Sequence, residues 1–271
     1  MAIKWYLAPD QTSWDQYWED KSLQAMSDAV KKYDSVVKDV INRNIVPGTV
    51  FFEGGCGLGR WLVYATDQGC QRVIGLDSYA EPLKILKAFR PAIETIHGSV
   101  EDIPLQNESV DFYFSGGVIE HFEEGPGRCL DEAHRILKKN GLMLVTVPYL
   151  NYYRSSLRRY FVMPLLKLLK PRFRNRNRQF YQYYYSRRDM RRFLAEAQFT
   201  VVEAWVSDGF STPRQSLGIY LEFPFLREQG GREWELNRAG WWLARLGNFF
   251  SRAIFGSVIG FLVKKSSATA A

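Results

Sequence analysis

Short apolar runs alternate with segments of helical periodicity between residues 49 and 147, and this rhythm limits the folds open to the chain. The run at 142–147 is apolar without interruption, which is typical of a central strand. Strands that alternate with helices predict parallel βαβ units with helices on both faces of one sheet. The expected strands cover residues 49–52, 72–77, 92–97, 110–114 and 142–147, and the expected helices cover 58–68, a segment from about Pro82, and 126–139.

The chain after residue 148 continues in a different way. Ser186 followed by Asp189 predicts the start of a helix that continues through 190–198. Two further apolar runs, at 199–206 and 257–263, have the pattern of strands. We therefore expect an N-terminal helical lid (1–45), an α/β core (46–148), a basic aromatic insert (149–185) and a completion of the core (186–271) with an insertion at about 208–255.

A glycine-rich segment follows the first expected strand and leads into a helix. Glycines at such a turn let the backbone approach a ligand closely, and the free amides of the helix start point towards it. The spacing is Gly55-x-Gly57-x-Gly59 rather than the GxGxxG of pyrophosphate binders. Glu53 precedes the glycines, and its carboxylate would repel a pyrophosphate but attract an ammonium group.

A second acid, Asp77, ends the next expected strand, where the hydroxyls of a ribose would donate hydrogen bonds to it. An amino-acid ammonium group and a ribose, with no phosphate between them, describe S-adenosylmethionine. A dehydrogenase is the competing interpretation, but it requires GxGxxG and leaves Glu53 without a role.

Five ordered segments resemble the class I S-adenosylmethionine-dependent methyltransferase family, in particular its type 11 branch. The resemblance covers roughly residues 48–148, with a weaker match at 186–206. It implies a doubly wound, mostly parallel, seven-stranded Rossmann-like sheet. The matching segments are EGGCGLGR (53–60), GLDSY (75–79), HGSVEDIP (97–104), SGGVIEHF (115–122) and NGLMLVTVP (140–148).

The resemblance also implies positions for the cofactor. Glu53 and the loop would hold the methionine moiety, Asp77 the ribose, and Ser78 would flank the adenine. Ser99 stands where the family usually has Asp at the adenine edge, so a hydroxyl or water would bind the exocyclic amine there. The implied cofactor-binding set is Glu53, Gly54, Gly55, Cys56, Gly57, Asp77, Ser78, Ser99, Val100, Ser115 and Gly116.

His121 is the candidate catalytic residue. It follows the fourth expected strand, at the carboxyl edge of the sheet where ligands bind in such folds. Methyl transfer to a hydroxyl is helped by a general base, and histidine titrates in the right range. A helix-start histidine with a structural hydrogen bond is the alternative.

The net charge of +7 is distributed unevenly. Between Arg154 and Arg192 there are thirteen Lys and Arg against one acid, a local balance of +12, and eleven aromatic residues lie between Tyr149 and Tyr185. Three interpretations fit this segment: a solvated lid, an RNA-binding face, or a helix lying on anionic lipid. The lipid interpretation rests on apolar residues at helical spacing: Leu157, Phe161, Leu165, Leu168 and Leu169.

The cysteines, the N-terminus and the most apolar stretch of the chain indicate the cellular compartment. The three cysteines form no CxxC pair, so we expect neither a disulfide framework nor a metal site. The N-terminus lacks the pattern of a signal peptide, and the most apolar stretch, 241–263, contains arginines. These features predict a cytoplasmic protein, and the lipid interpretation of residues 154–192 adds peripheral contact at the inner face of the membrane.

We therefore expect an enzyme that methylates a small-molecule, lipid- or sugar-linked acceptor at oxygen, with S-adenosyl-L-homocysteine as the product of the cofactor. Two alternatives stay open. One is an RNA or protein methyltransferase that docks through the basic insert, and the other is a catalytically silent cofactor-binding module.

Overall fold

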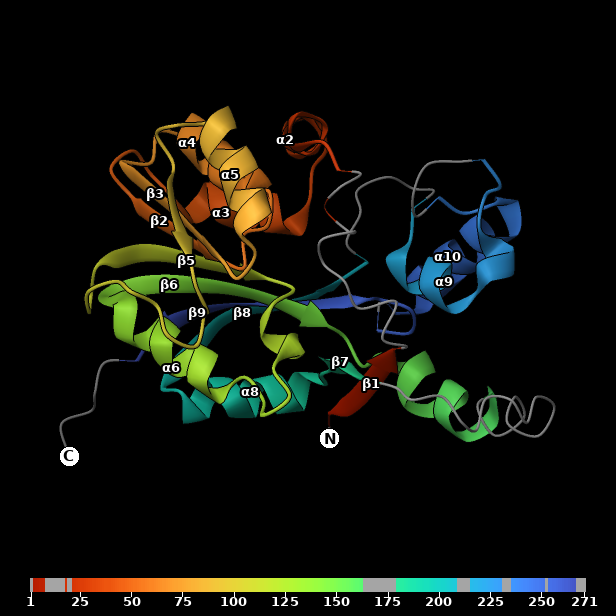
Figure 1. Cartoon of the computed structure of the whole chain (residues 1–271). Coiled ribbons are helices and arrows are strands. Elements are labelled where there is room, and N and C mark those ends of the chain that lie inside the picture. The colour runs from red at the N-terminus through yellow and green to blue at the C-terminus, as the bar shows by residue number, and fades with distance from the viewer. Residues whose placement is uncertain are drawn as a thin grey trace.

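A seven-stranded sheet organises the computed structural model (Figure 1). Its strand order is β4-β3-β2-β5-β6-β9-β8, and all strands run parallel except β9, which is antiparallel to both neighbours. The strands are β2 (Val50–Gly54), β3 (Arg72–Asp77), β4 (Glu94–His97), β5 (Val110–Gly116), β6 (Leu137–Pro148), β8 (Phe199–Ser207) and β9 (Val258–Lys265). The structure describes residues 2–7, 18, 21–162, 179–208, 215–230, 235–251 and 253–266.

Helices cover both faces of this sheet, which confirms the doubly wound fold (Figure 1). One face packs against α2 (Leu23–Lys32), α3 (Val36–Asn44), α4 (Arg60–Asp67) and α5 (Ala80–Phe89). The other face packs against α6 (Gly127–Ile136) and α8 (Arg187–Glu196), through side chains such as Leu130 and Met190. Ser186 and Asp189 form the expected capping box at the start of α8.

The helix expected at 126–139 ends earlier, at Ile136. Leu137 already pairs with Val110 of β5, and the next residue, Lys138, donates to both carboxylate oxygens of Asp111 at 2.8 and 2.9 Å. These contacts between neighbouring strands draw residues 137–141 into β6, although their sequence resembles a helix C-terminus.

The sequence predicts a helical N-terminal segment, but the structure shows that this segment is not helical throughout. Residues Ile3–Leu7 form strand β1, which pairs antiparallel with β7 (Gln179–Tyr184) in a separate two-stranded sheet. Figure 1 shows this pair beyond the end of the main sheet. The pairing partner lies more than 170 residues away along the chain, so no local pattern indicates it.

Residues 215–251 lie within the insertion expected at about 208–255, for which the sequence predicts no individual helices or strands. Helix α9 (Leu217–Glu222), the short 3₁₀ helix η5 (Pro224–Leu226) and α10 (Arg238–Phe250) pack around a small cluster of Ile219, Leu226 and Leu236. The π-helical segment η3 (Tyr153–Val162) leads away from β6. Within the described residues, no helix is long and apolar enough to cross a membrane.

Candidate active site

The glycine loop connects β2 to α4. Gly55 and Gly57 have φ values of +69° and +51°, in the left-handed region that favours glycine. The N–H groups of Gly55 and Cys56 both donate to the carbonyl of Leu76, at 2.7 and 3.0 Å. These bonds hold the loop against the end of β3, so the backbone of the first motif and the acid of the second lie together.

Glu53 is buried at the start of this loop, with 5% of its surface exposed. Its Oε2 atom has no hydrogen-bond partner among the described residues, although buried polar atoms are nearly always paired. Burial raises the pKa of Glu53 well above its usual range, while the positive charge of Arg60 acts in the opposite direction. An orphaned carboxylate oxygen at the wall of a cleft fits a cationic ligand group.

Asp77 connects the two motifs directly. Its Oδ2 accepts from the N–H of Gly57 at 2.7 Å, and its Oδ1 accepts from the N–H of Tyr79 at 2.9 Å. Burial raises the pKa of Asp77, and these backbone hydrogen bonds partly offset that rise. Asp77 therefore fixes the glycine loop, a role that the sequence did not indicate.

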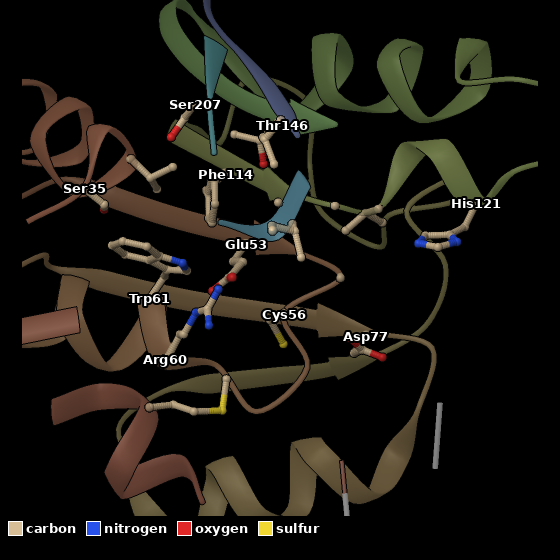
Figure 2. A pocket seen from close by; sticks show the side chains of 18 of the residues that line it. Ser35, Glu53, Cys56, Arg60, Trp61, Asp77, Phe114, His121, Thr146 and Ser207 are labelled. Atoms are coloured by element: carbon tan, nitrogen blue, oxygen red, sulfur yellow. The ribbon is translucent and has the colours of Figure 1, made fainter. Parts of the chain in front are cut away.

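A cavity of about 530 Å³ opens beside these residues, and Figure 2 shows many of the side chains that line it. Several predicted site residues come together here from the ends of β2, β3 and β5. The predicted residues on its wall are Glu53, Gly55, Cys56, Asp77, Ser78, Gly116 and His121.

The other predicted cofactor residues do not line this cavity, each for a local reason. Gly54 packs against Tyr113 and Val100 of the core, and Ser115 is fully buried. Gly57 is covered by the ring of Trp18. The Ser99 hydroxyl accepts from the N–H of Glu101 at 3.1 Å, which closes a local turn.

The cavity also contains residues that the sequence reasoning missed. Arg60 and Trp61 begin α4, directly after the glycine loop, and Figure 2 shows both beside Glu53. Thr146 and Ser207 come from the ends of β6 and β8. Parallel strands bring their carboxyl ends to one edge of a sheet, so the ends of these two strands could have been predicted as site positions. Three apolar side chains on the wall were also not indicated by the sequence: Phe114, Trp205 and Leu217.

Trp18 belongs to the N-terminal segment 1–45, for which the sequence predicts a helical lid. Trp18 lines the cavity. A Cβ added to Gly57 would occupy the space of the Trp18 ring. The closeness of this contact explains why the loop position requires glycine.

His121 lies in the one-turn helix η2 (Ile119–His121) at the cavity wall (Figure 2). Its Nδ1 is 2.7 Å from the carbonyl of Tyr181, and the two rings make an edge-to-face contact. A carbonyl can only accept, so Nδ1 carries the proton and Nε2 carries the lone pair. Burial lowers the pKa of His121, so the neutral form that a general base requires predominates at pH 7.

Glu120 precedes His121 and is buried. Its Oε1 lies 4.0 Å from Nε2 of His121, and its Oε2 has no hydrogen-bond partner among the described residues. Burial raises the pKa of Glu120 to about 8. This carboxyl, which the sequence did not indicate, is neutral at pH 7 beside the candidate base.

Arg154, the first cation of the basic insert, does not face solvent as a docking residue would. It is buried, and its Nε donates to Oε1 of Glu222 at 2.9 Å. Its guanidinium lies 4.5 Å from the centroid of the Tyr184 ring. Arg154 thus connects the start of the insert to α9 and β7. Leu165, Leu168 and Leu169 of the insert lie outside the described residues, as do the side chains of Leu157 and Phe161.

Residues 52–145 match the family model of a methyltransferase domain. These residues contain the glycine loop, both acids and His121. This part of the chain is a class I methyltransferase domain of the type 11 branch. S-adenosylmethionine is the cofactor of such domains, and the orphaned Glu53 oxygen and the glycine loop fit it.

Relatives and a solved structure agree with this domain. A protein from Mycolicibacterium smegmatis, named as a probable S-adenosylmethionine-dependent methyltransferase, is 33% identical over 37% of this chain and 38% of its own length. The malonyl-[acyl-carrier protein] O-methyltransferase of Yersinia pestis is 32% identical over 36% of each chain. A chain of the complex that contains the Haloferax volcanii Trm112 methyltransferase activator covers 95% of this chain and 99% of its own, with 19% identity and a TM-score of 0.63.

These comparisons differ in what they support. The chain matches little more than a third of the length of these two curated relatives. The solved structure spans nearly the whole chain and supports the fold. The acceptor and the partners of the whole protein follow from neither.

Proposed function

We propose that this chain transfers a methyl group from S-adenosylmethionine to a hydroxyl of a small-molecule, lipid- or sugar-linked acceptor. The observation that carries the proposal is the buried carboxyl of Glu53, a residue that lines the cavity and whose Oε2 has no hydrogen-bond partner among the described residues. An ammonium group placed there would pair this atom and reverse the rise in the pKa of Glu53.

Different residues on the cavity wall would bind different parts of the cofactor. Glu53 and the loop backbone would hold the methionine end, while Asp77 and Ser78 would hold the ribose and flank the adenine. Four predicted residues do not line the cavity and would instead support the residues that form its wall: Gly54, Ser99, Val100 and Ser115. When bound, the cofactor supplies an activated sulfonium methyl, so the protein contributes alignment and exclusion of water.

His121 is proposed as the general base for an oxygen acceptor. The Tyr181 carbonyl fixes the ring so that its Nε2 lone pair can receive the hydroxyl proton. The aromatic and aliphatic walls formed by Trp18, Phe114, Trp205 and Leu217 would exclude water from the transfer. The O-methyltransferase named among the relatives favours oxygen, and it acts on its own acceptor.

Calorimetry with S-adenosyl-L-homocysteine tests the cofactor part of this proposal without a known acceptor. Saturable binding with an affinity in the range of about 1 μM to 1 mM is expected. Tighter binding of NAD than of S-adenosyl-L-homocysteine would favour the dehydrogenase interpretation. Cofactor binding without any turnover of hydroxyl acceptors would favour the catalytically silent module.

Contact between residues 154–192 and an anionic membrane stays a proposal, with RNA or protein docking as the alternative. The exposed arginines of α8, Arg187, Arg188, Arg191 and Arg192, support a cationic surface there. Co-sedimentation with anionic vesicles, compared with a gel shift on structured RNA, separates the two.

A further inference from the structure

Helix α10 exposes an unusually apolar face to solvent. Trp242, Leu246, Phe249 and Phe250 are 62%, 58%, 83% and 70% exposed. At about 100° per residue these four positions fall within one side of the helix. The other exposed residues of α10 with described side chains are Arg238, Ala239 and Arg245. The face is therefore made of large apolar side chains and arginines.

The opposite face of α10 is anchored by small residues. A Cβ on Gly240 would lie 2.8 Å from the carbonyl oxygen of Leu226, and one on Gly247 would overlap the ring of Phe255. The backbone therefore packs closely against its lobe, with Leu243 and Ala244 partly buried. Because this inner face is closely packed, rotating the helix to bury its aromatic side chains would break these contacts.

The charge on this surface has one sign. Arg238 and Arg245 are the charged residues within α10, and the guanidinium of Arg245 lies 5.0 Å from the ring centroid of Trp241. Two copies meeting through this face would bring arginine against arginine, because a two-fold interface pairs the same surface with itself. Tryptophan, phenylalanine and leucine accompanied by arginine are typical of a helix at the boundary of an anionic bilayer.

The surroundings of α10 extend this aromatic character. The N–H of Tyr152 donates to the carbonyl of Ala253 at 3.0 Å, so the start of the basic insert lies directly after the end of α10. Tyr152 is itself exposed. On the other side, α10 packs against α9, whose first residue, Leu217, lines the active-site cavity. Figure 1 shows α9 and α10 together in a lobe apart from the helices that cover the sheet.

We propose that α10 is an interfacial helix, which inserts Trp242, Leu246, Phe249 and Phe250 into the headgroup region of an anionic phospholipid bilayer. Arg238 and Arg245 would contact lipid phosphates at the same depth. Docking through α10 brings the lobe that carries Leu217, and with it one wall of the cavity, to the membrane. This contact is separate from the proposed contact of residues 154–192 and does not depend on the identity of the acceptor.

Flotation of the full chain with vesicles tests the helix. The probes are vesicles of phosphatidylcholine mixed with phosphatidylglycerol, compared with vesicles of phosphatidylcholine alone. The wild type should float with the anionic vesicles, and Phe249→Ser combined with Phe250→Ser should lower its partition coefficient by about tenfold or more. The matched control is Ile85→Ser combined with Val202→Ser, two exposed apolar residues on α5 and β8. This control should float like the wild type.

Two further measurements keep the result interpretable. Affinity for S-adenosyl-L-homocysteine should be unchanged in both double variants, which shows that they are folded and separates this test from that of the methyltransferase site. Combined Arg238→Gln and Arg245→Gln should weaken binding to anionic vesicles. The remaining binding should fall less steeply with rising salt concentration than that of the wild type. Equal flotation of wild type and the phenylalanine variant, or no flotation of the wild type, would overturn the proposal. A wild-type dimer that the same variant converts to a monomer, without vesicle binding, would assign the face to a second copy instead.

Discussion

The carboxylate of Asp77 accepts a hydrogen bond from the backbone N–H of Gly57 at 2.7 Å, so the acid of the second motif holds the loop of the first. Asp77, which we propose as the residue that binds the ribose, therefore also shapes the loop. This double role changes what its variants report, because removing the side chain alters the apo structure as well as the ligand contact.

Replacing Asp77 by Ala and by Asn should therefore give different results. Asp77→Ala leaves the N–H groups of Gly57 and Tyr79 without their acceptor, at a cost of about 1–3 kcal/mol in stability, and weakens cofactor binding. Asp77→Asn retains one acceptor oxygen and should lose less stability. Thermal unfolding combined with calorimetry measures both quantities. Equal stability of the two variants and the wild type would contradict the structural role.

Gly57→Ala should weaken cofactor binding by about tenfold or more, because the new Cβ would displace the ring of Trp18 from the cavity wall. Gly48→Ala is the matched control. Gly48 also has a positive φ, of +98°, but a Cβ there meets nothing within 4 Å. Both variants share the backbone strain of about 1–2 kcal/mol, whereas only Gly57→Ala should lose affinity in calorimetry. An equal effect of both would assign the loss to strain alone.

The stability of the chain should depend on Glu120 in a defined pH window. The folded-state pKa is raised to about 8 from an ordinary value of 4.5. The folded state therefore holds the proton more tightly, and this contribution to stability is complete below about pH 4.5 and is lost as the pH rises through 8. At about 1.4 kcal/mol per pKa unit, the free energy of unfolding should fall by roughly 3 kcal/mol between pH 5 and pH 8 relative to Glu120→Gln. Denaturant unfolding at both pH values measures this difference, and parallel curves for wild type and variant would refute the prediction.

His121→Ala should lower turnover by roughly 10²–10⁴-fold and leave cofactor affinity nearly unchanged, if His121 takes the acceptor proton. Because burial lowers the pKa of His121, wild-type turnover should decline only below about pH 6.5. Steady-state kinetics with an active hydroxyl acceptor across pH measure both effects. A loss of only a few-fold would return His121 to a structural role, in which it secures the segment that contains Tyr181.

The core and the glycine loop could be predicted from the sequence because their signals are local. Apolar runs such as 142–147 and the spacing of Gly55 and Gly57 are visible in short windows. Contacts between distant segments leave no such signal. The pairing of β1 with β7 and the burial of Arg154 against Glu222 depend on where the chain returns after the insert.

The most direct test of the central claim is a calorimetric titration of S-adenosyl-L-homocysteine against wild type and Glu53→Gln at several pH values. Burial raises the pKa of Glu53 in the ligand-free cleft, whereas a bound ammonium group favours the carboxylate. Binding must therefore release a proton below that raised pKa, so wild-type affinity should increase as the pH rises towards it. Glu53→Gln should bind more weakly and without this pH dependence. Equal affinities for the two proteins at every pH, or no binding by the wild type, would contradict the assignment of this cleft to the cofactor.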